Sequence, residues 1–542
     1  MVNLFKMNLI IVMVLFFTSN CNSQDTLQSL PKNSSTQDPH SIENDALHDN
    51  DNNKIDNINS EKPATQNKNS DPNYNDILKP GGNIGTTSSD DNNPCKDNNC
   101  EVSLSEQCQS NVRALVFIDD RLYQLLKNEI NTYLNLACDR RKFGIDIFHE
   151  HGLDDVSPQQ IRAKILQKLA NFPELEGVLF IGNIKLSTFF LPRADILTTR
   201  YWPRYFEDLD MKAQKLWQDG TQMNVCSENS PLPCFVNDFN GNNGSTLVPP
   251  HDFDDVTQGD SFGPEIWAAF LPVGFSNPLS NSYKNFAEQL LPFFKKVLHF
   301  YQNPIEYDRS FYHVGNDINL VEKFLPIFWN LIGPDHIDYY SIHPQGESFC
   351  KDNPNCYTRV PLENYTAPEE FISYAQTLPW IGEGWQSSNV FIGHMNSFLR
   401  RVVTWNTHGM ETWALLSSQE VEQIQENHGG ALAIIMGCGV AGFKQPGNTS
   451  FVDTAVSVEN NLLINIIYGR SAFVATTGTT HIRGHADEFQ VILQKMYQEH
   501  LYLGQAHKER LLYQDQLAGD VGYELRGKHE ILLGDPFLDV NE

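Results

Sequence analysis

Short apolar runs separated by polar, turn-forming stretches recur along the chain from about residue 110 to its end. Apolar runs bounded by Gly, Pro, Asn or Asp are typical of buried strands, and apolar residues at helical spacing are typical of helices that cover a sheet. The strands that this pattern predicts are Ala114–Ile118, Gly144–Phe148, Gly177–Ile181, Glu265–Phe270, Phe311–Val314, Ile337–Ile342, Val390–His394, Val402–Trp405, Ala431–Met436 and Ala472–Thr476. Strands that alternate with helices predict an α/β fold.

Two helices are marked by their terminal residues. One begins at Ser157-Pro158, where Gln160 completes a capping box with Ser157. A longer amphipathic helix is predicted at Ser282–Gln302, and the Asn303-Pro304 step ends it.

The first residues are typical of an export signal. Lys6 precedes an apolar stretch from Leu9 to Phe17, which is too short to span a membrane. We therefore expect a signal peptide at residues 1–21 and a protein at the cell surface, in the outer membrane or outside the cell. Cys21 follows Thr18-Ser19-Asn20, which loosely resembles a bacterial lipobox, so a lipid anchor to a bacterial membrane and an ordinary soluble secretion signal are both open.

Residues 22–107 are dominated by Asn, Asp, Ser, Gln and Lys. Such a segment has too little apolar surface to offset the entropy of ordering the chain, so we expect a disordered tether or a removable pro-segment. The rest of the chain is long enough for two stacked α/β units, which we place at 108–305 and 306–542. A loop-rich insertion is expected between Tyr201 and Asp260.

The charge of the chain limits its partners. Its 67 Asp and Glu residues against 39 Lys and Arg residues give a formal charge of −28. This argues against nucleic acid, which selects basic surfaces, and is compatible with divalent cations or basic substrates.

Two of the apolar runs are followed by residues with side chains that are common in catalysis. Thr407-His408-Gly409 follows the run at Val402, and Gly437-Cys438 follows ALAIIM. Residues just past neighbouring parallel strands meet in one crevice, so His408 and Cys438 are expected together. A thiol needs a neighbouring imidazole to become a good nucleophile, and Gly409 lets its own N–H approach a developing oxyanion. The alternative is a buried structural Cys with an incidental His.

The residues around this pair resemble the His and Cys blocks of gingipain-like cysteine peptidases, the caspase-fold superfamily called clan CD. The blocks that carry the resemblance are THGMETW, SSQEVEQI, ALAIIMGCGVAGF, VENNLLINIIYGRSAFVATTGTT and LLGDPFLDV, with EGVLFIGNI, RYFEDLD and GDSFGPEIWAAFLPV upstream. The resemblance covers about residues 110–542. It implies a caspase-like three-layer α/β/α fold and an exported cysteine endopeptidase of protein or peptide substrates, with no organic cofactor required.

The resemblance also implies a third catalytic residue and a specificity residue. Glu265 stands where the family places an acid that pairs with the catalytic His, with Asp260 as the runner-up; a strand-end acid facing solvent is the alternative. Phe270 stands where the family commonly has Arg. Asp487 falls where lysine-specific relatives place an acid in the S1 pocket, which would select Lys or Arg by charge pairing; the alternative is an acid at a helix start.

Cysteine usage fits an oxidising compartment. Eight of the ten cysteines remain when Cys21 and Cys438 are set aside. Short separations in sequence suggest Cys226–Cys234 and Cys350–Cys356 as local disulfide pairs, but they do not fix the connectivity. No CxxC spacing is present, which argues against a zinc ribbon.

No metal site is predicted. His481 and His485 lack a third ligand. The alternating spacing of oxygen-bearing side chains in the first part of a calcium loop is present at Asp238, Asn240 and Asn242. An ordinary turn rich in Asn and Gly is the preferred interpretation of this segment. The resemblance leaves a structural calcium ion open.

The sequence therefore predicts an exported cysteine endopeptidase, with a catalytic Cys438–His408 dyad, Glu265 as orienting acid and the Gly409 and Cys438 amides as oxyanion hole. Two other classes stay open: a sortase-like transpeptidase of the same fold, and a non-catalytic cell-surface binding protein.

Overall fold

The computed structural model describes twelve main stretches of the chain and five short ones. They are residues 100–103, 111–186, 188–192, 197–201, 203–209, 263–304, 308–315, 318–342, 357–360, 362–377, 388–406, 409–410, 412–437, 439–444, 456–479, 489–521 and 530–541. The statements below concern these residues.

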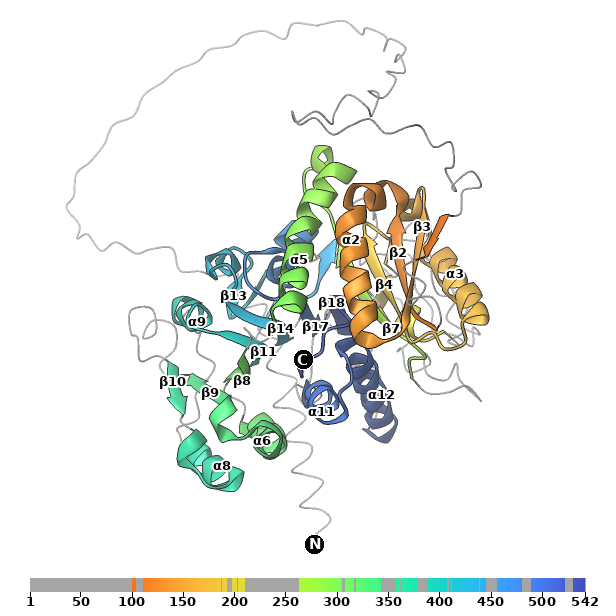
Figure 1. The fold of residues 1–542 in the computed structure, drawn as a ribbon. Coiled ribbons are helices and arrows are strands. Elements are labelled where there is room, and N and C mark those ends of the chain that lie inside the picture. Colours follow the sequence, from red (N-terminus) through yellow and green to blue (C-terminus); the bar gives the residue numbers. More distant parts are fainter. Residues whose placement is uncertain are drawn as a thin grey trace, which may run out of the picture. The chain divides into compact units, whose positions relative to one another are not determined.

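A twelve-stranded sheet forms the centre of the described structure, in the order β1-β3-β2-β4-β7-β18-β17-β14-β11-β8-β9-β10 (Figure 1). Its strands are β1 (Cys100–Ser103), β2 (Val112–Asp119), β3 (Gly144–Glu150), β4 (Gly177–Gly182), β7 (Trp267–Pro272), β8 (Asp308–Gly315), β9 (Ile337–Ile342), β10 (Tyr357–Val360), β11 (Leu399–Asn406), β14 (Gly429–Met436), β17 (Ala475–Thr479) and β18 (Glu530–Gly534). The short pairs are β5 (Thr188–Pro192) with β6 (Leu197–Tyr201), β12 (Trp413–Ala414) with β13 (Leu416–Ser417), and β15 (Phe443–Lys444) with β16 (Val456–Ser457).

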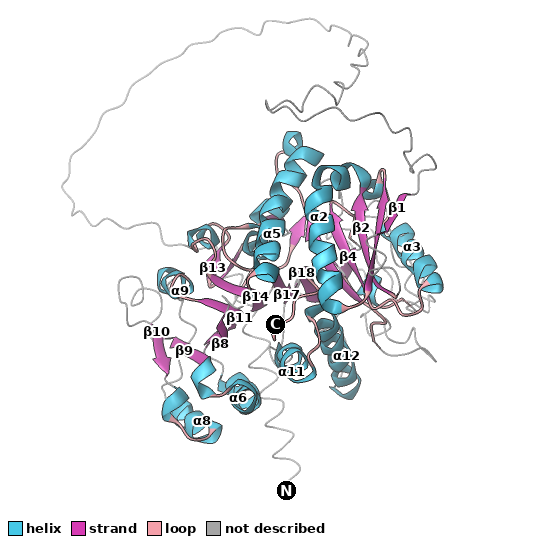
Figure 2. Ribbon diagram, in the orientation of Figure 1, coloured by secondary structure: helices cyan, strands magenta, loops and turns pink. Residues whose placement is uncertain are grey.

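Helices flank this sheet (Figure 2). They are α2 (Asp120–Arg141), α3 (Pro158–Asn171), α4 (Arg204–Glu207), α5 (Tyr283–Gln302), α6 (Ile318–Ile332), α8 (Pro368–Thr377), α9 (Ser388–Met395), α10 (Leu462–Tyr468), α11 (Phe489–Glu499) and α12 (Leu503–Val521). Most strand pairs are parallel and helices flank the sheet, so the molecule is an α/β protein, which is consistent with the expected caspase-like fold.

The two halves of the sheet run in opposite directions. Strands β2, β3, β4, β7 and β18 are parallel to one another, and so are β8, β9, β11, β14 and β17. The reversal falls between β17 and β18, which pair antiparallel. The carboxyl ends of the two sets of strands therefore lie at opposite edges of one continuous sheet.

Neighbouring residues of β3 show how the two faces of the sheet are covered. Phe148 lies under Lys164 and Lys168 of α3, whereas His149 stacks on Tyr123 of α2 with ring centroids 4.5 Å apart. Because successive residues of a strand point to opposite faces, α2 and α3 cover opposite faces. The α3 face carries an in-register aromatic row across four strands, formed by Phe148, Phe117, Phe180 and Phe270.

The terminal residues of both predicted helices are confirmed. The Ser157 side chain and the Gln160 side chain make both bonds of the capping box of α3. Ser282 caps α5 and accepts from the Asn285 amide at 3.3 Å.

The predicted strand Val390–His394 is wrong, because these residues belong to α9. Phe391, Ile392 and Met395 are buried, and this spacing is helical. A short apolar run does not distinguish a buried helix from a buried strand by itself.

Two other predicted strands are displaced, and the prediction of disorder is wrong for one short segment. The strand expected at Glu265–Phe270 begins at Trp267, because the amides of Glu265 and Ile266 donate to the Glu207 carbonyl instead of to a neighbouring strand. The strand expected at Ala472–Thr476 begins at Ala475. Within the segment expected to be disordered, Cys100–Ser103 forms β1, which pairs antiparallel with β3.

Candidate active site

Strands β11 and β14 bring the two candidate loops to one edge of the sheet. They pair in parallel from Leu399 and Gly429 to their last residues, Asn406 and Met436, which are partners in register. His408 and Cys438 each come two residues after this last pair. Both lie outside the described residues, so the site is defined by the residues that flank them: the β11 loop (residues 407–412) and the β14 loop (residues 437–442).

Gly409 is the point of contact between the β11 loop and the β14 loop. A Cβ atom at Gly409 would lie 3.1 Å from the Cα of Gly437 and 2.6 Å from Cγ1 of Val440. It would also lie 3.2 Å from the Cβ of Ala414. The residue after His408 therefore packs directly on the residue before Cys438, and a side chain at position 409 would force the two loops apart.

The β14 loop makes a tight turn that is bonded on both sides. Gly439 has a φ of 64°, in the left-handed region that favours glycine, and its carbonyl accepts from the Gly442 amide at 2.8 Å. The Ala441 amide donates to the carbonyl of Thr479 on β17 at 3.0 Å. The Nδ2 group of Asn461 donates to the carbonyls at residues 440 and 442. Backbone conformation directly after Cys438 is thus fixed by the neighbouring strand and helix.

A hydrogen bond joins the end of β11 to the hairpin that follows the β11 loop. The buried indole Nε1 of Trp405 donates to the carbonyl of Ala414 at 3.0 Å. Leu415, with a φ of 66°, turns the chain so that β12 pairs with β13. The residues that precede and follow the β11 loop are therefore linked to each other.

Glu265 lies at the same edge of the sheet, but several strands away. It precedes β7, which runs opposite to β11, so the start of β7 lies at the same edge of the sheet as the ends of β11 and β14. Three strands, β18, β17 and β14, lie between β7 and β11 in the sheet. The distance between β7 and β11 is therefore about 19 Å at the usual interstrand spacing. The Glu265 carboxylate accepts from the Leu209 amide at 2.5 Å, and its carbonyl accepts from the Lys508 ammonium at 2.7 Å. Its pairing with His408 stays a prediction.

The other predicted site residues lie outside the described residues. These are Asp487, Asp260, Cys21, His481, His485, Asp238, Asn240 and Asn242, together with the cysteines of the suggested pairs, Cys226, Cys234, Cys350 and Cys356. Across the described part of the chain, no three His, Cys, Asp or Glu residues are grouped so as to hold a metal ion. Among the described helices, none combines the length and the apolar character needed to cross a membrane.

Sequence reasoning missed a buried polar cluster, which includes one ion pair, at the edge where the candidate loops lie. Arg510 of α12 contacts Glu530, the first residue of β18, with 2.7 Å between Nη2 and Oε1. His507 and Glu207 are also fully buried, 3.6 Å apart between Nε2 and Oε1. A buried ion pair has a desolvation cost that can equal its attraction, so the cluster fixes the position of α12 more surely than it stabilises the fold. Its residues come from α4, α12 and β18, and no local sequence pattern links them.

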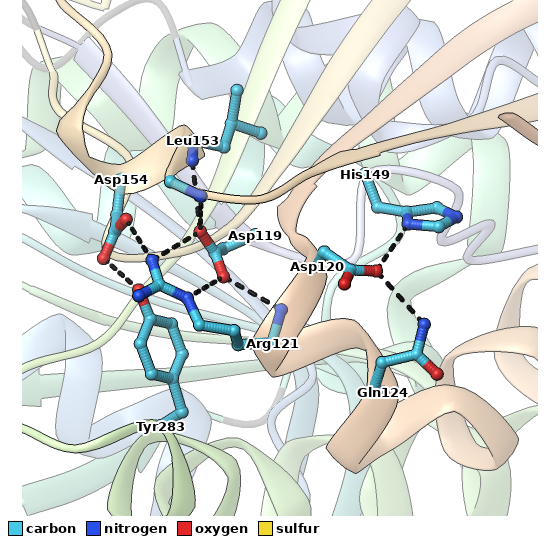
Figure 3. Close-up of polar contacts among 9 residues, drawn as sticks. Asp119, Asp120, Arg121, Gln124, His149, Leu153, Asp154 and Tyr283 are labelled. Atoms are coloured by element: carbon cyan, nitrogen blue, oxygen red, sulfur yellow. Dashed lines mark hydrogen bonds and ion pairs between the residues drawn. The ribbon is translucent and has the colours of Figure 1, made fainter. Parts of the chain in front are cut away.

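A second polar cluster lies at the opposite edge, where β2 and β3 end (Figure 3). The Asp119 carboxylate accepts from Arg121 Nε at 2.9 Å and from the Gly152 amide at 2.8 Å. Arg121 Nη2 also donates to Asp154 at 3.0 Å, and the Tyr283 hydroxyl donates to Asp154. The cluster joins β2, the turn after β3 and the start of α5, and it faces away from the candidate loops.

Burial and hydrogen bonding shift the pKa values of the groups in this second cluster. Burial tends to raise the pKa of Asp119, but the hydrogen bonds from Arg121 outweigh it and hold this pKa below its usual value. Burial raises the pKa of Asp154 above its usual value. Burial and the bond to Asp154 raise the pKa of Tyr283, so this phenol stays protonated. A paired and fully bonded set of this kind is a structural clamp.

The family comparison agrees with the geometry of the candidate loops. Two parallel strands that lead into the His loop and the Cys loop at one edge of the sheet are the arrangement expected of a caspase-like cysteine peptidase. Residues 287–541 match the model of peptidase family C25, the gingipain family of clan CD cysteine peptidases. The protein is therefore a cysteine-type endopeptidase that acts on protein or peptide substrates.

The match has limits that bear on the site. It begins within α5 and includes β11, β14 and β18, but it leaves out Glu265 and the upstream blocks that resemble the family. No curated protein matches the chain.

Proposed function

We propose that the protein cleaves peptide bonds with Cys438 as nucleophile and His408 as the base that accepts its proton. The amides of Gly409 and Cys438 form the oxyanion hole that stabilises the tetrahedral intermediate. The observation that carries this proposal is the contact of Gly409 with Gly437 and Val440, which joins the two loops beside the catalytic pair. The family match supports the same chemistry.

Two further residues complete the proposal. Glu265 orients His408 and stabilises its cation, as the family resemblance implies, and its place at the same sheet edge supports this role. Asp487 lies in the S1 pocket and selects Lys or Arg at P1. Its place between β17 and α11, one strand beyond β14, supports a pocket near Cys438.

We also propose that the protein is exported. Cys138 is disulfide-bonded, which fits an oxidising compartment. The apolar segment before Cys21 supplies the export signal, and Cys21 is the lipid attachment site if the anchor is present. A structural calcium ion, which the family resemblance leaves open, is the one metal ion in this proposal.

Cys438→Ala tests the proposed nucleophile. Turnover of a peptide library should fall by several orders of magnitude, because the members of a catalytic unit act together. The fold should survive, so the thermal unfolding midpoint should stay close to that of the wild type. A thiol-reactive peptide probe should label the wild type at Cys438 and leave the variant unlabelled.

The same assay separates the competing functions. Release of a product joined to an added amine would identify a transpeptidase. A wild-type protein that neither turns over the library nor reacts with the probe would be a binding protein. An active Cys438→Ala protein would exclude Cys438 as the nucleophile.

A further inference from the structure

The side chain of Asn461 is buried behind the loop that carries Cys438. Its Nδ2 group donates to the Val440 carbonyl at 3.0 Å and to the Gly442 carbonyl at 3.1 Å. Its Oδ1 atom accepts from the Ile464 amide at 3.2 Å and so caps α10. The residue is fully buried. One amide group therefore ties the helix start to the β14 loop.

The β14 loop requires these bonds because of its shape. Gly439 is in the left-handed region, and the Gly442 amide turns back to the Gly439 carbonyl at 2.8 Å. This tight turn directs the carbonyls of Val440 and Gly442 into the protein, where an unpaired carbonyl is costly. Asn461 is the side chain that accommodates both carbonyls.

Val440 connects Asn461 to the β11 loop. Its Cγ1 atom lies 2.6 Å from the Cβ position of Gly409, the residue after His408, and its Cγ2 atom lies 2.7 Å from the Cβ position of Gly478 on β17. Val440 is fully buried between these two glycines. A shift of the Val440 carbonyl would therefore move the contact on which the spacing of the two loops depends.

We propose that Asn461 is a positioning residue for the Cys438–His408 pair. By bonding both carbonyls of the turn, it holds the backbone after Cys438 in the conformation that places the thiol beside the imidazole and directs the Cys438 amide at the oxyanion. This inference rests on the proposed function, because it assigns Asn461 a role only if Cys438 is the nucleophile.

Asn461→Asp separates the two roles of the side chain. A carboxylate still caps α10, but it places an acceptor opposite two carbonyl oxygens. A misplacement near 1 Å can cost about a hundredfold in rate, so we expect kcat to fall by about that factor while KM stays within about twofold. The matched control is Asn465→Asp. Asn465 makes two bonds of the same kind, to the carbonyls of Glu459 at 2.8 Å and Asn461 at 2.9 Å, but none to the β14 loop.

The pH dependence of thiol alkylation distinguishes positioning from mere stability. Iodoacetamide should alkylate Cys438 of the wild-type full-length chain with a midpoint below the ordinary thiol pKa of about 8.5. In Asn461→Asp the midpoint should rise by about one unit toward that value, because the thiolate loses its imidazolium partner. Asn465→Asp should keep the wild-type midpoint, even if its unfolding temperature falls.

A second variant covers the case in which Asn461→Asp does not fold. Asn461→Ser keeps a good helix cap but is too short to reach both carbonyls. Wild-type kcat and a wild-type alkylation midpoint in either folded variant would overturn the role of Asn461. An active Cys438→Ala protein would instead overturn the proposed nucleophile, so the two failures are distinguishable.

Discussion

Gly409 allows the β11 loop and the β14 loop to approach closely, in addition to its proposed role as an oxyanion donor. The nearest atoms to its Cβ position are a buried valine methyl group, the backbone of Gly437 and a buried alanine. None of these is the free end of a flexible side chain, so a methyl group at position 409 is accommodated only if the two loops separate. The residue that is proposed to donate an oxyanion N–H is also the residue that sets the loop spacing.

Gly409→Ala should therefore lower kcat/KM by at least about a hundredfold, because separation of the loops misplaces the catalytic groups. The matched control is Gly393→Ala in α9, where no heavy atom lies within 4 Å of the Cβ position. Alanine in a helix interior is favoured over glycine by about 0.5–1 kcal/mol, so the control should be active and slightly more stable. Peptide hydrolysis and thermal unfolding of the two variants provide the comparison. Equal activities would show that the loop contact is not essential.

At the scale of single elements, the sequence predicted those whose terminal residues carry their own signal. The capping box of α3 and the Ser282 cap of α5 depend on neighbouring residues and were predictable. Helix α9 was not, because its run of apolar residues is shorter than the length at which periodicity separates a helix from a strand. The strand pair β11 and β14 was predicted correctly, and with it the meeting of the two candidate loops.

Asp535, directly after β18, links two helices to the end of the sheet. Its carboxylate accepts from the Tyr133 hydroxyl of α2 at 2.6 Å and from the Tyr301 hydroxyl of α5 at 2.7 Å. It also accepts from the Phe537 amide at 2.9 Å. Burial outweighs these bonds and raises the pKa of Asp535 from 3.8 to about 6. This carboxyl belongs to the GDP block, whose role here is to join elements.

The raised pKa predicts how Asp535 affects stability as the pH changes. The folded state binds this proton more tightly than the unfolded state, so the contribution is complete below about pH 4 and is lost as the pH rises through about 6. The shift corresponds to about 3 kcal/mol. Asp535→Asn cannot titrate, so its free energy of unfolding relative to the wild type should rise between pH 4 and pH 7. Urea unfolding at several pH values measures this difference. Parallel pH curves for the two proteins would contradict the assigned pKa.

At the scale of the whole molecule, the sequence predicted two α/β units but not how they join. Strand β18 comes from the end of the chain and lies between β7 of the first half and β17 of the second. It pairs parallel with β7 and antiparallel with β17. A strand of five residues that is far from its partners in sequence has no local pattern that predicts its position in the sheet. The block that contains it, LLGDP, nevertheless resembles the family.

The position of β18 predicts that the two halves do not fold independently. Removal of residues 522–542 would leave β7 and β17 without a shared partner and would remove the fully buried Ile531, Leu532 and Leu533. Loss of each buried leucine or isoleucine alone costs about 2–5 kcal/mol, which is comparable to the whole stability of a domain when summed over the strand.

The truncated chain should therefore lose cooperative unfolding in both halves, measured by circular dichroism and by the elution volume in size-exclusion chromatography. Removal of residues 22–94 is the control, since the polar composition of that segment predicts no buried surface, and this chain should unfold as the full-length protein does. A β18 truncation that still unfolds in one sharp transition would show that each half carries its own complete core.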